Sequence, residues 1–109
     1  MRVLVVGAGG VGAAFAAIAQ RRPVFERVVL ADVSPRRARD AIARLDEADR
    51  FAAERVDASD RAGLVALIER VKPDAVLNAC DPRFNEPIFG ACFDAKTTYL
   101  DMAMTLSEP

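Results

Sequence analysis

Apolar residues recur along this chain with a helical spacing in four separate segments. In each segment they fall at positions i, i+3, i+4 and i+7, which places them on one face of a helix. The four predicted faces are Val11, Ala14, Phe15 and Ile18; Ala38, Ala41, Ile42 and Leu45; Leu64, Leu67, Ile68 and Val71; and Ile88, Ala91, Cys92 and Ala95. Ser34 followed by Pro35 suits the start of the second helix, and Ser59 is a candidate cap for the third. Lys72 followed by Pro73 ends that third helix, because proline cannot continue it.

Five short β-rich runs lie before, between and after these helices, at residues 3–6, 28–31, 53–57, 75–79 and 97–101. The first, second and fourth runs are apolar on both sides of the pleat, which is typical of parallel strands covered by helices on two faces. Because crossovers between parallel strands are right-handed, the alternation predicts an α/β fold with a doubly wound parallel sheet of strand order 3-2-1-4-5. The 109 residues are expected to form one domain, 1–109.

Composition excludes several classes of protein. A hydrophobic share of 52% is too high for a disordered chain. The net charge of -1 comes from 15 scattered Lys and Arg against 16 Asp and Glu, which argues against a nucleic-acid partner. No apolar run is long enough to predict a membrane span. Cys80 and Cys92, without any histidine, offer too few ligands for a zinc site and no disulfide framework, so we expect no metal and a reducing, cytoplasmic compartment.

The strongest chemical signal is the stretch GAGGVG, which directly follows the first predicted strand and opens the first predicted helix. In a Rossmann dinucleotide site, Gly7 would permit the tight turn, Gly9 would let the backbone approach a pyrophosphate, and Gly12 would let the helix pack closely on the strand. The helix that begins near Gly10 would direct its free N–H groups at the phosphates. Asp32 lies twenty positions past Gly12, at the end of the second strand, where a carboxylate accepts hydrogen bonds from the adenosine ribose. A glycine-rich turn without a ligand is the alternative interpretation.

Residues at the ends of the other strands are candidates for the rest of the site, because ligands of open α/β sheets bind beyond the carboxyl ends of the strands. Asp57 and Ala58 follow the third strand, beside the expected adenine, although Asp57 suits a helix cap equally well. The fourth strand ends in Asn78, Ala79 and Cys80, whose small side chains leave room for the nicotinamide half of a cofactor.

Cys80, Cys92 and Asp101 carry side chains that could take part in chemistry. Cys80 has no evident neighbouring base or lysine that would make it a reactive thiol, and Cys92 falls on an apolar helix face and is assigned to the core. Asp101 ends the fifth strand, where it either faces the cleft or caps the structure.

The opening MRVLVVGAGGVG, the Asp57-Ala58 pair, the segment VLNACDPRFNEPIFGAC and the strand Tyr99-Leu100-Asp101 together resemble a known family. They are similar to the N-terminal domain of saccharopine dehydrogenase-like enzymes, which include saccharopine reductases and carboxynorspermidine dehydrogenases. The resemblance covers essentially the whole chain. It implies an NAD(P)-linked oxidoreduction at the secondary amine of an amino acid or a polyamine, through an imine.

The resemblance also assigns residues. The pyrophosphate loop corresponds to Gly7, Gly9, Gly10, Val11 and Gly12, and the adenosine-ribose segment to Asp32 and Val33. The adenine edge corresponds to Asp57 and Ala58, and the segment beside the nicotinamide ribose to Asn78, Ala79 and Cys80. Saccharopine reductases often carry a tyrosine shortly after the fourth strand, where this chain reads Asp81-Pro82-Arg83, and this departure favours a relative with another substrate.

Enzymes of this family are much longer, so we expect the sequence to be the cofactor-binding part of a larger enzyme. It would bind a dinucleotide without turnover, and the substrate domain and catalytic residues would lie elsewhere. A non-catalytic sensor of NAD(H) and an interaction fold with a vestigial site are the rival functions. The oligomeric state stays open, a homodimer included.

The choice of cofactor depends on the residues around Asp32. Its carboxylate accepts from a free 2′-hydroxyl and repels a 2′-phosphate, whereas Arg36 and Arg37 on the following helix could pair with that phosphate. The arginines must reach back across Ser34-Pro35, and they have Asp40 as an alternative partner on the helix surface. The sequence therefore predicts NAD as the preferred cofactor, with NADP as the alternative.

Overall fold

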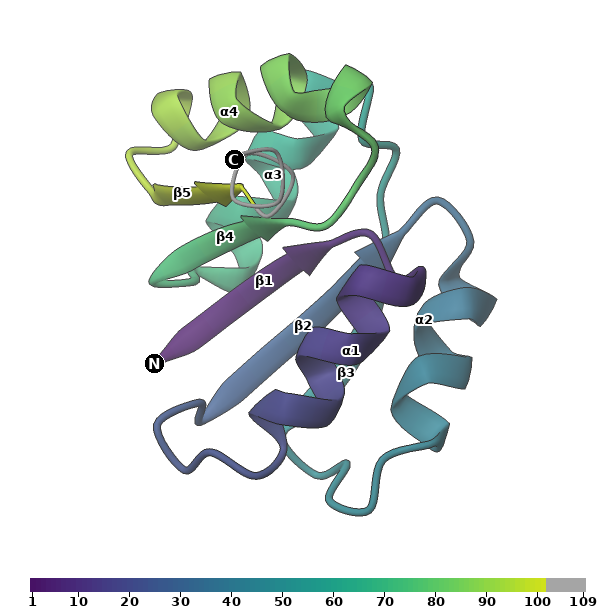
Figure 1. Cartoon of the computed structure of the whole chain (residues 1–109). Coiled ribbons are helices and arrows are strands. Elements are labelled where there is room, and N and C mark those ends of the chain that lie inside the picture. Colours follow the sequence, from purple (N-terminus) through teal and green to yellow (C-terminus); the bar gives the residue numbers. More distant parts are fainter. Residues whose placement is uncertain (102–109) are drawn as a thin grey trace, which may run out of the picture.

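The computed structural model describes residues 1–101, in which strands and helices alternate along the chain (Figure 1). The strands are β1 (Arg2–Val6), β2 (Arg27–Asp32), β3 (Phe51–Arg55), β4 (Ala75–Asn78) and β5 (Thr98–Asp101). The helices are α1 (Gly10–Ala19), α2 (Pro35–Ala43), α3 (Arg61–Val71) and α4 (Asn85–Asp94), with the short 3-10 helix η1 (Pro82–Phe84) before α4. All strands pair in parallel in the order β3-β2-β1-β4-β5, which confirms the predicted sheet.

Helices cover both faces of the sheet, and the strands β1 to β4 contribute to two separate cores. In β1, Val3 and Val5 pack against the side of α1 and α2, whereas Leu4 and Val6 pack against the side of α3 and α4 (Figure 1). This alternation follows from the pleat, which turns successive side chains to opposite faces. It explains why β1, β2 and β4 are apolar on both faces apart from polar residues at their ends, as the sequence indicated.

The buried face of α1 differs from the predicted one. Val11 and Ile18 are exposed, Ile18 by 59%, and the buried residues of the helix are Gly12, Ala16 and Ala19. The physical reason is the close approach of the helix to the loop before it: a Cβ on Gly12 would lie 1.9 Å from the carbonyl oxygen of Gly7. At that separation small residues face the sheet, Val11 and Ile18 point outward, and Phe15 packs half-buried against the edge of the core. The other three helical faces are buried or half-buried as predicted.

The third strand and the cap of α3 also differ from the prediction. β3 begins at Phe51, two residues before the predicted start, because Phe51 is buried in the core and pairs in register with Val28. β3 also ends at Arg55, two residues before the predicted end, so Asp57 lies beyond the strand, in the turn that leads to α3. Asp60 caps α3 in place of Ser59, since its carboxylate accepts from the backbone N–H of Gly63 at 3.1 Å.

Other boundaries agree with the sequence to within a residue. Ser34 caps α2 with Pro35 as the first helical residue, and α3 ends at Val71, followed by its C-cap Lys72, which adopts a left-handed conformation with φ of 54°. The remaining strand shifts are of one residue: β1 begins at Arg2, β2 spans Arg27–Asp32, β4 ends at Asn78 and β5 begins at Thr98. Within residues 1–101, no helix has the length and apolar character needed to cross a membrane.

Candidate functional site

A hollow of 480 Å³ opens at the carboxyl ends of β1, β2 and β4, where open α/β sheets bind their ligands. The glycine loop, the start of α2, the β3–α3 turn and the segment after β4 all contribute to its wall. Of the predicted site residues, those that line this groove are Gly7, Gly9, Asp32, Val33, Asp57, Ala58, Ala79 and Cys80. Segments far apart in the sequence therefore meet around one groove.

The glycines of the loop fall into two pairs with different surroundings. Gly7 has a φ of 108°, which side chains rarely allow, and a Cβ there would lie 2.9 Å from the carbonyl oxygen of Ala79. Gly12 is held against Gly7, as described for α1. At Gly9 and Gly10, by contrast, a Cβ would meet no protein atom within 4 Å. The fold thus requires the first pair to be glycine, whereas the second pair leaves open space beside the backbone.

The N-terminus of α1 is a second feature suited to an anion. No side chain caps this helix, and its first N–H groups have no intrahelical acceptor. The positive end of the helix dipole adds to their effect. Gly10, Val11 and Gly12 do not line the groove with side chains, so any contact they make with a phosphate would come from these backbone groups.

Asp32 connects the glycine loop to the start of α2. Its side chain is only 6% exposed, and its two oxygens accept from the backbone N–H groups of Ala8 at 2.8 Å and Ser34 at 2.9 Å. A carboxylate oxygen accepts more than one hydrogen bond, so each retains capacity for a ribose hydroxyl. The residue therefore has a structural role besides the predicted one.

The two arginines near Asp32 take different directions. Arg36 is exposed and lies 4.0 Å from Asp40 on the helix surface, as the alternative interpretation had it. Arg37 lines the groove instead, with Nη1 at 3.6 Å from Oδ2 of Asp32. The groove thus holds a carboxylate and a guanidinium side by side at the place expected for the adenosine ribose.

Asp57 and Ala58 form the wall of the groove beyond β3. The Asp57 carboxylate accepts from both the backbone N–H and the hydroxyl of Ser59, at 2.9 and 2.6 Å, and these bonds lower its pKa. Asp57 is therefore ionised at neutral pH and shapes the turn before α3 without being its N-cap. Within the described residues, its Oδ2 accepts no hydrogen bond.

Beyond β4 the three predicted residues have different positions. Ala79 and Cys80 line the groove, but Asn78 is fully buried behind them, with all of its side-chain hydrogen bonds directed to protein groups. The Cys80 thiol donates to the carbonyl oxygen of Val6 at 3.3 Å. Burial, together with the charges of Asp32 and Asp81, raises the pKa of Cys80 to about 11, so it is a neutral thiol at pH 7 rather than a nucleophile.

Cys92 is 1% exposed in the core, as expected. Several residues of the wall were not among the predicted ones: Val6, Val56, Ser59, Asp81, Arg83 and Phe84. Arg37 was predicted only for the NADP alternative, as a partner of the 2′-phosphate. Arg83 and Phe84 belong to η1, with the guanidinium carbon 5.0 Å from the centre of the ring. Arg83 and Phe84 could have been found from the sequence, because they lie shortly after a strand that ends in the site.

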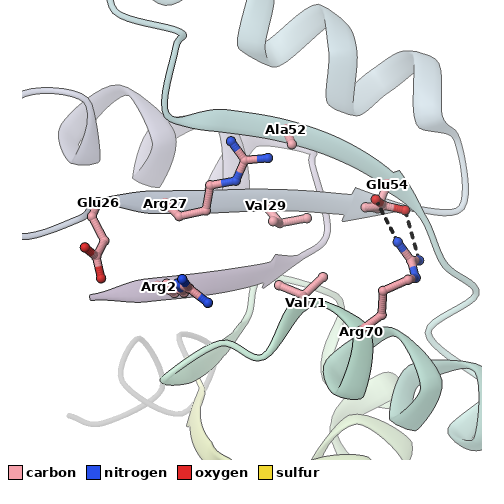
Figure 2. A pocket seen from close by; sticks show the side chains of 8 residues that line it. All are labelled: Arg2, Glu26, Arg27, Val29, Ala52, Glu54, Arg70 and Val71. Atoms are coloured by element: carbon pink, nitrogen blue, oxygen red, sulfur yellow. Dashed lines mark hydrogen bonds and ion pairs between the residues drawn. The ribbon is translucent and has the colours of Figure 1, made fainter.

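A second hollow, of 530 Å³, lies on the face of β1, β2 and β3 beside the end of α3 (Figure 2). Figure 2 shows the guanidinium of Arg70 directed at the carboxylate of Glu54, which it meets at 3.0 and 3.1 Å. Arg2 and Arg27 are register partners on adjacent strands at its edge. None of the predicted site residues lines this hollow, and it lies away from the glycine loop. We interpret it as a part of the sheet that α3 leaves uncovered.

Comparisons with known proteins show the family to which the chain belongs. The family model described as "Saccharopine dehydrogenase NADP binding domain" matches residues 3–108. Carboxynorspermidine synthase of Vibrio cholerae serotype O1 is 36% identical over 114 residues, covering 97% of this chain and 28% of that protein. This chain therefore spans little more than a quarter of that curated relative.

Solved structures share the fold. Apo saccharopine dehydrogenase (L-Glu forming) from Saccharomyces cerevisiae superposes with a TM-score of 0.76 at 17% identity, over 92% of this chain and 21% of that one. UDP-glucose-4-epimerase from Stenotrophomonas maltophila, solved with bound NAD, gives a TM-score of 0.70 at 21% identity, over 93% of this chain and 36% of that one. At these identities the likeness concerns the fold alone, whereas the family model covers nearly every residue. The chain thus belongs to the saccharopine dehydrogenase NADP-binding domain family.

Proposed function

We propose that the groove binds a nicotinamide dinucleotide and that the chain serves as the cofactor-binding domain of an oxidoreductase acting on a secondary amine or imine. The observation that supports it most directly is the contrast within the glycine loop. Gly7 and Gly12 are required by packing, but nothing in the fold requires Gly9 and Gly10 to lack a side chain. Open space beside an uncapped helix N-terminus is what a pyrophosphate needs.

Each part of the cofactor has a candidate partner in the groove. The backbone of Gly9 and Gly10 would hold the pyrophosphate, Asp32 the adenosine ribose, and the turn at Asp57 the adenine edge. Ala79 would leave space for the nicotinamide ribose. When bound, the nicotinamide supplies or accepts a hydride. The residues described here bind and orient it, and we assign the recognition of substrate to parts of the enzyme outside them.

The substrate class is inferred from the relatives. The curated relative is named carboxynorspermidine synthase, and a solved neighbour is named saccharopine dehydrogenase. Both names, with the family resemblance of the sequence, favour an amino acid or a polyamine joined to a carbonyl compound through an imine. The cleft residues Asp81 and Arg83, in place of a tyrosine, favour the polyamine relatives over saccharopine reductases.

The chain is expected to bind NAD or NADP weakly and to show no oxidoreductase activity. Titration calorimetry with both cofactors measures the binding, and ADP alone shows how much affinity the nicotinamide half contributes. An assay of NADH and NADPH oxidation with candidate imine partners measures turnover. Absence of saturable binding by either cofactor would contradict the proposed function, and turnover would show that these residues suffice for catalysis.

The choice between the two cofactors is expected to depend on Arg37. The preference for NAD that Asp32 predicts stays a prediction, but the guanidinium of Arg37 lies close enough to neutralise that carboxylate and to meet a 2′-phosphate. Arg37→Ala should weaken NADP binding about 10- to 100-fold, the effect of one charge-assisted hydrogen bond, and change NAD binding much less.

Arg36→Ala is the matched control, since Arg36 points to Asp40 and should affect neither cofactor. Competitive titrations of NAD and NADP on both variants make the comparison. Equal losses for the two cofactors in Arg37→Ala would show that Arg37 does not read the 2′ position. Asp32→Ala is a poorer test, because it also leaves the buried N–H of Ala8 without its acceptor.

A further inference from the structure

Asn78 lies at the centre of a hydrogen-bonded network directly behind the groove. Its side chain is 0% exposed, yet it makes three hydrogen bonds. Its Oδ1 accepts from the backbone N–H of Cys80 at 2.9 Å. Its Nδ2 donates to Oδ1 of Asn85 at 2.8 Å and to the hydroxyl of Tyr99 at 3.0 Å. One buried amide thus joins the end of β4, the start of α4 and β5.

The direction of every bond in this network follows from one backbone group. The N–H of Cys80 can only donate, so the Asn78 atom that faces it must be the oxygen. The remaining nitrogen donates, and the atom that Asn85 presents must therefore be its oxygen. Tyr99 accepts from Asn78 and hence directs its own hydrogen at Oδ2 of Asp101, 2.8 Å away. No amide in the network can flip without losing a bond.

The network ends at the wall of the groove. Ala79 and Cys80 form that wall, and they contact the glycine loop, since a Cβ on Gly7 would lie 3.0 Å from the sulfur of Cys80. The thiol in turn donates to Val6, at the end of β1. Asn85 and Tyr99 line no part of the groove, but they fix the amide that holds this wall in place.

We propose that Asn78 is a positioning residue for the cofactor groove, held in place by Asn85 and Tyr99, so that these two residues determine dinucleotide affinity without touching the ligand. The inference rests on the proposed function, because it concerns the same groove. Loss of either partner leaves a buried Asn78 donor without an acceptor, and relief requires the amide, and with it the Cys80 backbone, to move.

Two variants remove a partner while keeping the surroundings. Tyr99→Phe removes only the hydroxyl and retains the edge-to-face contact with Phe89, at 5.4 Å between ring centres. Asn85→Ala removes the other acceptor. Both are expected to weaken dinucleotide binding about fivefold, the effect of one buried hydrogen bond, and to speed alkylation of Cys80 by iodoacetamide several-fold.

Controls separate positioning from simple stability. Asn85→Asp keeps an acceptor for Asn78 at the first residue of α4, where a carboxylate is favourable, and should bind and alkylate like the parent. Arg70→Ala breaks the ion pair with Glu54 away from the groove. It should change neither the dinucleotide affinity nor the rate of Cys80 alkylation. Cys92, buried in the core, serves as the internal standard, because its alkylation reports global unfolding.

The measurements are titration calorimetry with NAD and NADP, and mass spectrometry of the two alkylated cysteines, at a temperature where every variant is folded. If the parent binds cofactor and both partner variants match it in affinity and in Cys80 alkylation, the network only stabilises the fold and the proposal is wrong. If the parent binds no cofactor, the proposed function fails, and Cys80 alkylation alone decides whether Asn78 positions the wall.

Discussion

Replacing Gly12 by alanine is expected to destabilise the fold by about 3 kcal/mol or more, a large share of the total for a domain of this size. The added Cβ would lie 1.9 Å from the carbonyl oxygen of Gly7, a backbone atom that cannot turn aside as a side chain would. Relief requires α1 to move away from β1 or the turn at Gly7 to open. Urea denaturation followed by circular dichroism measures the change in the free energy of unfolding.

Gly10→Ala is the matched control for this substitution. Gly10 is the first residue of the same helix, and a Cβ there meets no protein atom within 4 Å. Alanine is favoured over glycine in a helix by up to about 1 kcal/mol, so this variant should be as stable as the parent or more so. Equal stability of Gly12→Ala and Gly10→Ala would contradict the packing role assigned to Gly12.

Most of the fold could be predicted because its signals are local. Strands buried on both faces read as continuous apolar runs, and Ser34-Pro35 and Lys72-Pro73 mark helix ends through their own backbone chemistry. The buried face of α1 could not be predicted in this way. Periodicity selects the larger apolar residues, whereas the distance to the glycine loop, set by Gly12, requires small ones.

The start of β3 shows a second limit. Short runs such as Phe51 to Val56 alternate weakly, so their pattern does not fix where pairing begins; the register with β2 does, and it is a long-range property. The site, too, has residues that local signals predict and residues that depend on the tertiary structure. Gly9 and Asp32 belong to a local motif and line the groove.

Asn78 and Arg37 required the tertiary structure. The sequence predicts Asn78 in the segment beside the nicotinamide ribose, whereas in the structure it is buried and bonded to Asn85 and Tyr99, which the topology brings to it from 7 and 21 residues away. Arg37 and Arg36 are adjacent in sequence, and only the phase of α2 directs one to the groove and the other to Asp40. Residue type alone therefore could not show which of the two arginines lies at the groove.

Gly9→Val is expected to abolish dinucleotide binding while the fold survives. Gly9 has a φ of -76° and a ψ of -156°, outside the left-handed region that favours glycine, and a Cβ there meets no protein atom within 4 Å. The valine would instead occupy the space through which the backbone approaches a pyrophosphate. Titration calorimetry should detect no binding of NAD or NADP, a loss of more than about 100-fold or 2.7 kcal/mol.

Thermal denaturation of the same variant separates this effect from unfolding. Valine is a poorer N-cap than glycine, so a decrease of about 1 kcal/mol in stability is expected and does not explain a lost site. Ala17→Val places the same isopropyl side chain at an exposed position of α1 and should leave binding unchanged. If Gly9→Val binds cofactor as well as the parent, the open space at Gly9 does not hold the pyrophosphate, and the glycine loop is only a tight turn.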